Sequence, residues 1–78
     1  MKARIVVRLR PGVLDPQGTT IRKALESLGF PEVRELRVGK ILELTLDETD
    51  RARAEARLEE MCRKLLANTV VENFRVEL

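Results

Sequence analysis

The sequence predicts a small two-layer α+β fold, in which an antiparallel sheet carries two helices on one face. Apolar and charged residues alternate at both ends of the chain, which is typical of half-buried strands. Two stretches between them have helical periodicity and begin at residues that favour helix N-termini. The resulting order is related to ferredoxin-like folds. We expect residues 1–78 to form a single domain, because no linker, repeat or low-complexity segment interrupts them.

The first strand and the first helix are predicted from local signals. Residues 2–10 alternate, with Val6 as the one exception. Pro11-Gly12 ends this strand, and Asp15 before Pro16 is typical of an N-cap and the first helical position. Gly29 stands where a left-handed C-terminal cap is expected. The apolar stripe of this helix comprises Ile21, Ala24, Leu25 and Leu28.

The stretch 33–46 decides how the two halves of the chain are arranged. Its apolar residues share one parity, namely Leu36, Val38, Leu42, Leu44 and Leu46. A two-residue hairpin turn at Gly39-Lys40 would expose the last three of them, so we reject it. A three-residue loop at 39–41 and one long strand kinked at Gly39 both keep the parity, and we favour the long strand. A strand of this length projects beyond its own subunit, which predicts a segment-swapped dimer.

The C-terminal part predicts a second helix and a last strand. Residues 50–67 form the helix, which Asn68 closes. Residues 70–78 form the strand, with Phe74, Val76 and Leu78 facing inward. The apolar stripe of the helix comprises Ala54, Leu58, Met61, Cys62, Leu65 and Leu66.

Length and composition limit the possible functions. A chain of 78 residues builds a small core and commonly needs a disulfide, a metal or oligomerisation. Cys62 is the only cysteine and there is no histidine, so oligomerisation is expected. The net charge of +2 is spread among interleaved cations and carboxylates, and Tyr and Trp are absent, which disfavours nucleic-acid binding. No apolar run is long enough to span a membrane, and we expect a cytoplasmic protein.

The sequence offers few residues for catalysis. Cys62 lies on an apolar stripe, so we expect a buried structural thiol. Asp15 could be an acid or a helix cap, and we favour the cap. Gly12 and Gly18 could belong to a phosphate cradle, but their spacing fits no known phosphate-binding motif, so we favour a tight turn. We expect no catalytic residue and no metal site, which favours an interaction module over an enzyme; a free-standing small-molecule-binding regulatory domain and, less favoured, a basic RNA-binding module stay open as alternatives.

Four segments resemble the PurS family, and together they cover nearly the whole chain. The loop Arg10-Pro11-Gly12-Val13-Leu14-Asp15-Pro16-Gln17-Gly18 resembles the family's hallmark, with Arg10 in place of the usual lysine. Leu28-Gly29-Phe30 with the preceding Ala24-Leu25 resembles the end of the first helix. Arg37-Val38-Gly39-Lys40 lies within a segment similar to the family's long strand. The run from Cys62 to Glu72 resembles its C-terminal motif, with Thr69 in place of the usual proline.

The resemblance implies a function within a purine-biosynthetic enzyme. PurS proteins are small subunits of formylglycinamide ribonucleotide amidotransferase, also called FGAM synthase. They hold the glutaminase PurQ against the ATP-dependent synthetase PurL and assist ammonia transfer. The resemblance also implies a homodimer, with pairing into tetramers left open, and no cofactor bound by this chain, since ATP and Mg²⁺ are used by the synthetase. The candidate partner-interface residues are Arg10, Pro11, Gly12, Val13, Asp15, Gln17, Gly18, Arg37, Lys40 and Asn68.

Overall fold

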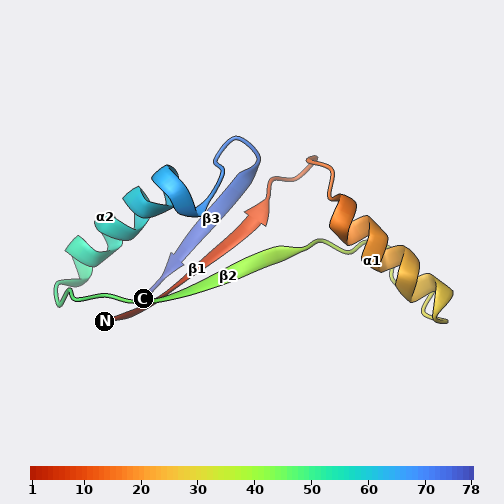
Figure 1. The fold of residues 1–78 in the computed structure, drawn as a ribbon, viewed down its shortest axis with the longest axis horizontal. Helices are drawn as coiled ribbons and strands as arrows, with labels where there is room; N and C mark the ends of the chain where they lie inside the picture. Colours follow the sequence, from red (N-terminus) through yellow and green to blue (C-terminus); the bar gives the residue numbers. More distant parts are fainter.

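The computed structural model describes residues 1–78 as a three-stranded antiparallel sheet with two helices (Figure 1). The elements in chain order are β1 (Lys2–Leu9), α1 (Pro16–Ser27), β2 (Gly39–Thr45), α2 (Arg51–Met61), a π-helical turn (Cys62–Leu66) and β3 (Glu72–Glu77). The strand order is β2-β1-β3, so the N-terminal strand is the central one. The predicted α+β class with an antiparallel sheet is confirmed. None of the helices combines the length and the apolar character needed to cross a membrane.

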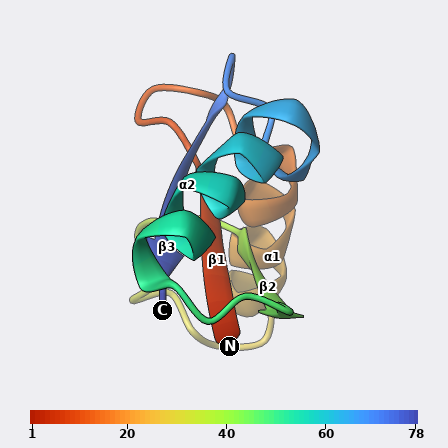
Figure 2. The same ribbon diagram turned by 90° about the vertical axis from the view of Figure 1, so that its left-hand side faces the viewer.

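The core lies on one face of the sheet, beneath α2 (Figure 2). β1 places Ala3, Ile5 and Val7 on this face, and α2 with its π-helical turn contributes Leu58 and Cys62. The register pairs Ile5 with Leu42 on one side and with Val76 on the other, so the inward residues of all three strands meet. The predicted inward faces of the first and last strands are therefore confirmed.

No hairpin turn interrupts the chain between residue 33 and the end of β2. Lys40 and Ile41 lie in the ladder opposite Val7 and Val6, so the loop considered at residues 39–41 is absent. Leu42, Leu44 and Leu46 pack against the core, as the shared parity predicted. Only Gly39–Thr45 is paired as a strand, however, and residues 33–38 have no strand partner within the chain. The predicted long strand is thus hydrogen-bonded along its second half alone, because β1 ends at Leu9 and offers the first half no neighbour.

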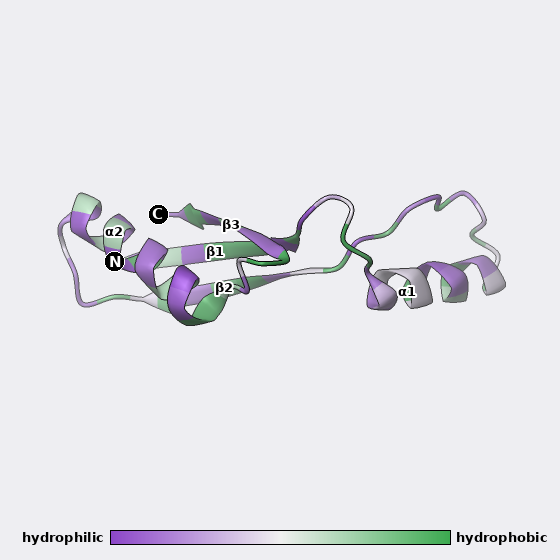
Figure 3. Cartoon of the chain, turned by 90° about the horizontal axis from the view of Figure 1, so that it is seen from above, coloured by the Kyte–Doolittle hydropathy of each residue, from purple (hydrophilic) through white to green (hydrophobic).

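α1 lies beyond the end of the sheet rather than on it (Figure 3). The molecule is accordingly elongated, with extents of 49 × 23 × 15 Å. The apolar stripe of α1 finds no core: Ile21 is 39% and Leu28 is 73% exposed. The two helices of one chain therefore do not lie side by side on its sheet. This separation of α1 from α2 is what a segment-swapped dimer requires.

The second helix changes its hydrogen-bonding pattern at Cys62. The Ala67 amide donates to the Cys62 carbonyl at 3.0 Å, an i→i+5 bond typical of a π-helical turn. This wider turn directs Leu66 and Ala67 toward the core and turns Leu65 outward, where it is 83% exposed. The prediction that Leu65 belongs to the buried stripe is therefore wrong, because it assumed regular α-helical periodicity up to residue 67.

Cys62 is fully buried, as predicted for a structural thiol. Burial raises the pKa of this thiol and the nearby Glu59 carboxylate raises it further, so the reactive thiolate is disfavoured. We expect Cys62→Ser to destabilise the fold by about 1–3 kcal/mol, because it buries a hydroxyl among apolar groups. Urea unfolding measures this, and Cys62→Ala, which buries no polar group, is the matched control and should cost less. Rapid reaction of the native thiol with a thiol reagent would contradict the assignment.

Candidate functional site

The residues resembling the family hallmark lie where three connections meet at one end of the sheet. We call this region the junction; it comprises residues 10–15, 35–40 and 68–71. The first segment follows β1, the second leads into β2 and includes its first two residues, Gly39 and Lys40, and the third precedes β3. Antiparallel pairing to the central β1 brings them to the same end of the sheet. The junction also connects the sheet to α1 (Figure 1).

Asp15 joins the beginning of α1 to the segment that returns from it. Its Oδ1 accepts a hydrogen bond from the Gly18 amide and its Oδ2 accepts one from the Val38 amide, each at 2.8 Å. The first of these bonds is the predicted N-cap. Asp15 is buried as a residue, at 8% exposure. Both of its oxygens are thus occupied by backbone donors.

The pKa of Asp15 is lowered from its ordinary value of 3.8. The Val38 amide is the largest cause, followed by the Gly18 amide, and the Arg37 guanidinium adds a smaller effect. Because the pKa is lower in the folded state than in the unfolded state, the charged carboxylate stabilises the fold at pH values above the unfolded-state pKa of about 3.8. This stabilisation is lost as the pH falls through the lower folded-state pKa. At neutral pH Asp15 is therefore a structural anion and not a general acid.

Arg10 fastens the loop after β1 to the turn before β3. Its Nε and Nη2 donate to the Thr69 carbonyl at 3.2 and 2.7 Å, and its backbone amide donates to the Val71 carbonyl at 2.8 Å. Its own carbonyl accepts a hydrogen bond from Arg37 Nη2 at 3.1 Å. One residue thereby holds all three segments of the junction together.

A hollow of about 950 Å³ opens at the junction, beside the end of the sheet. Four of the predicted site residues line it, namely Pro11, Gly12, Arg37 and Lys40. It is also lined by Arg8, Glu35 and Asn73, which are not among the site residues predicted from the sequence. Their convergence depends on the strand register, which places Arg8 opposite both Gly39 and Asn73. The sequence indicates the position of Arg8 only through the alternation along β1, which places Arg8 on the charged face of the strand, close to Pro11-Gly12.

The remaining predicted residues do not line the hollow. Val13 is half-buried and its amide donates to the Arg10 carbonyl, while Gln17 is exposed on the first turn of α1. Asn68 organises its own turn: its Oδ1 accepts from the Val70 amide, and its carbonyl accepts from Val71 and Glu72. Whether any of these residues contacts a partner stays a prediction.

The two glycines of the hallmark loop serve backbone geometry. Gly12 has a φ of +86°, which glycine adopts without strain. A Cβ atom on Gly18 would lie 2.3 Å from the Leu36 carbonyl oxygen, so the helix and the returning segment touch there. The favoured interpretation as a tight turn agrees with the geometry of Gly12, whereas Gly18 lies within α1, where its lack of a side chain permits the close contact with Leu36. No group of three or more acidic, cysteine or histidine side chains is placed to hold a metal ion.

The comparisons with known proteins agree on one family. The family described as "PurS: Phosphoribosylformylglycinamidine (FGAM) synthase" matches residues 2–78. A PurS subunit from Synechocystis is 51% identical over 75 residues, which cover 96% of this chain and 75% of the relative. The structure of Bacillus subtilis PurS superposes with a TM-score of 0.89 at 46% identity, covering 97% of this chain and 94% of the other. A chain of the PurLQS structure from Thermotoga maritima superposes with a TM-score of 0.87 at 34% identity, with coverages of 97% and 93%.

The close contact at Gly18 should reverse the usual effect on stability of replacing a helical glycine with alanine. Within a helix, Gly→Ala normally stabilises by up to about 1 kcal/mol. We expect Gly18→Ala to destabilise instead, by about 1–3 kcal/mol, because the added methyl group meets the Leu36 carbonyl. Urea unfolding of this variant beside Thr19→Ala, an exposed neighbour on the same helical turn, measures the effect. Stabilisation by Gly18→Ala would show that α1 and residues 35–38 do not touch.

Proposed function

The chain belongs to the PurS family, and from this premise we propose that it is the bridging, non-catalytic subunit of FGAM synthase. In this role it holds a PurQ-type glutaminase against a PurL-type synthetase and assists the passage of ammonia between them. The enzyme converts formylglycinamide ribonucleotide, glutamine and ATP to formylglycinamidine ribonucleotide and glutamate in the cytoplasm. The observation that carries the proposal is the match of residues 2–78 to this family, together with the structural likeness to a chain of PurLQS.

The chemistry of the chain supports a role without catalysis. Its one thiol is buried with a raised pKa, and its one buried carboxylate is held by two backbone amides. No buried side-chain polar atom lacks a hydrogen-bond partner, so no buried polar group is left unsatisfied for a substrate to engage. We assign ATP and Mg²⁺ to the synthetase and no cofactor to this chain. The whole-chain match does not favour the alternative of a free-standing small-molecule-binding domain.

The position of α1 supports a segment-swapped homodimer as the form that acts. The stripe of α1 is exposed within one chain, and residues 33–38 lack a strand partner. A second copy that receives α1 buries this stripe and completes both cores. The two junctions of the dimer then display the predicted partner residues, among them Arg10, Gln17 and Lys40, for contact with the catalytic subunits.

Reconstitution tests the proposed function. The synthetase and glutaminase subunits alone should form little product from glutamine, and adding this chain should restore glutamine-dependent synthesis. Ammonia supplied directly should bypass most of the requirement, because the synthetase keeps its own active site. The pure chain should hydrolyse neither glutamine nor ATP. A hydrolysis rate in the pure chain that one of its own point mutations abolishes would refute the non-catalytic role.

A further inference from the structure

The edge of β2 that faces away from β1 has no neighbouring strand within the chain. Leu46 exchanges both backbone hydrogen bonds with Met1: its amide donates to the Met1 carbonyl at 2.7 Å, and the Met1 amino group donates to its carbonyl at 2.8 Å. In an antiparallel ladder such doubly bonded pairs recur at every second residue, so Leu44 and Leu42 also turn their backbone groups toward β1. The residues that turn their amides and carbonyls to the free edge instead are Ile41, Glu43 and Thr45.

The same alternation continues along residues 33–38, which have no strand partner within the chain. The Val38 amide donates to Asp15, in the loop that follows β1, so the backbone of Val38 points toward the β1 side. Leu36 and Val38 are half-buried, whereas Arg37 between them is exposed. This stretch and β2 therefore present one continuous free edge, with apolar side chains on the face that α2 covers and polar side chains on the outer face.

A second copy of the chain is the occupant that fits this edge. An unpaired strand edge is a template for a further strand, and in the segment-swapped dimer the second copy brings its residues 33–38 to the edge together with its α1. Both copies turn the same alternate residues to the edge, so exposed residues pair with exposed residues and the apolar residues of both copies share the core face. The second copy then occupies part of the hollow at the junction, whose lining includes Arg37, Gly39 and Ile41.

Side-chain chemistry favours one register among those that keep this alternation. Opposite charges meet on the outer face when Glu43 lies opposite Arg37 of the second copy, and we call these two residues the edge pair. The apolar pairs that this register brings together on the core face are Leu42 with Val38 and Leu44 with Leu36. Like charges meet where Lys40 faces its own symmetry mate, and the long side chain can carry each ammonium group to solvent.

The two neighbouring registers lack this match of charges. A shift by one pleat in one direction places Glu35 opposite Glu43, and like charges directly opposite each other are destabilising. The opposite shift keeps apolar residues together, but it places Arg37 opposite Thr45 and Ile41 opposite its own symmetry mate. Arg37 then has no carboxylate opposite it.

The favoured register also continues a row of alternating charge across the sheet. Glu77 of β3 lies opposite Arg4 of β1, and Arg4 lies opposite Glu43 of β2. Arg37 of the second copy adds the next cation to this row. Cross-strand pairs of opposite charge stabilise neighbouring strands, so the row favours this partner at this position.

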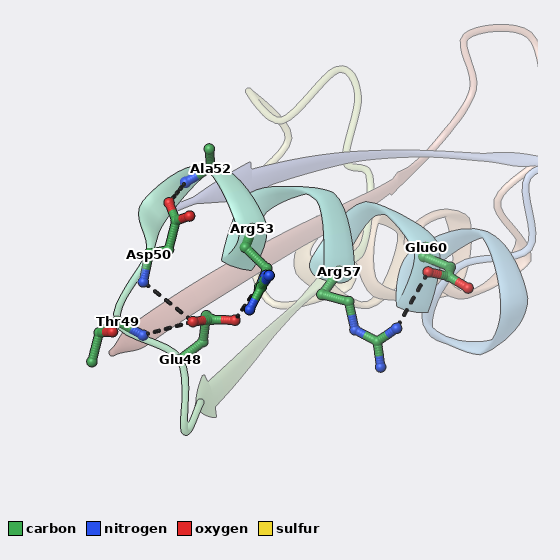
Figure 4. Close-up of polar contacts among 7 residues, drawn as sticks. All are labelled: Glu48, Thr49, Asp50, Ala52, Arg53, Arg57 and Glu60. Carbon is green, nitrogen blue, oxygen red and sulfur yellow. Dashed lines mark hydrogen bonds and ion pairs between the residues drawn. The ribbon is translucent and has the colours of Figure 1, made fainter.

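The edge pair is free to form because neither member has an ion pair within its own chain. The charges on α2 are arranged differently: Figure 4 shows Arg53 beside Glu48 and Arg57 beside Glu60. Such surface pairs leave little charge for a partner to recognise. The free edge therefore offers charges that the chain has not neutralised itself.

We propose that residues 33–45 of two copies pair as antiparallel strands about a two-fold axis, with Arg37 of each copy opposite Glu43 of the other. This inference rests on the proposed function, because it specifies the contact within the homodimer that acts there. It assigns Arg37 to the contact between the copies instead of the contact with the catalytic subunits. It also joins the two sheets into one, which fixes the positions of the two junctions relative to each other.

Cysteine cross-linking tests the register. Along one extended strand the Cα atoms of residues 37 and 43 are roughly 20 Å apart, whereas a disulfide needs about 7 Å or less. Arg37→Cys with Glu43→Cys should therefore link two chains on mild oxidation, seen on a non-reducing gel, and the buried Cys62 takes no part. Glu35→Cys with Glu43→Cys, and Ile41→Cys alone, are the matched controls for the shifted registers and should link about tenfold more slowly or less.

Neutral substitutions test the edge pair without new cysteines. Arg37→Gln and Glu43→Gln should each raise the dissociation constant of the dimer by about threefold or more, measured by sedimentation, because the symmetry repeats the pair. The double variant should be weakened by less than the product of the two single effects, since both substitutions remove the same interaction. Effects that simply multiply would show that the two residues do not interact.

The outcomes separate the inference from the proposed function. If the wild-type chain is a dimer that supports glutamine-dependent synthesis, but a control cross-links faster than the Arg37 and Glu43 cysteine variant or none of them cross-links, the proposed pairing is wrong and the proposed function stands. If the wild-type chain is a monomer in sedimentation, the pairing and the swapped dimer are both wrong, and reconstitution with the catalytic subunits still decides the bridging role.

Discussion

The straight run of the chain from residue 33 into β2 separates α1 from the sheet of its own chain. Asp15 reinforces the separation, because its carboxylate ties the start of α1 to Val38 at the start of β2. Gly18 lets the helix approach the returning segment closely enough for this bond. α1 and residues 29–34 thus form one arm that extends past the junction. An isolated helix of this length gains little stability in water, so the arm needs a surface outside its own chain.

This division gives the two ends of the molecule different tasks. Under α2, the sheet completes a small core in which Ile5, Leu58 and Cys62 are fully buried. At the junction, hydrogen bonds between side chains and the backbone hold the loops in place: the Arg10 side chain donates to the Thr69 carbonyl, and the Asp15 side chain accepts from the Val38 amide. Loops held rigidly on a scaffold are well suited to partner contacts, because binding then costs little ordering entropy. In the function that we propose, the arm serves a second copy and the junction serves the catalytic subunits.

Most of the fold could be predicted from the sequence because its signals are local. Alternation along β1, the Asp15-Pro16 cap and the parity of Leu42, Leu44 and Leu46 each depend on neighbouring residues alone. The exposure of Leu65 could not be predicted, because the π-helical turn changes the hydrogen-bonding pattern without altering the apolar pattern before it. The hollow was predicted in part: Lys40 and Arg37 were selected, but the approach of Arg8 depends on the register between distant strands.

Thermal unfolding followed over a wide range of protein concentrations tests the central claim, that α1 finds its core on a second chain. Folding and dimerisation are then a single event, so the melting temperature rises with concentration and sedimentation detects no folded monomer. Circular dichroism should show the helices lost together with the dimer. A stable monomer at low micromolar concentration, with full helicity and a melting temperature independent of concentration, would contradict the account.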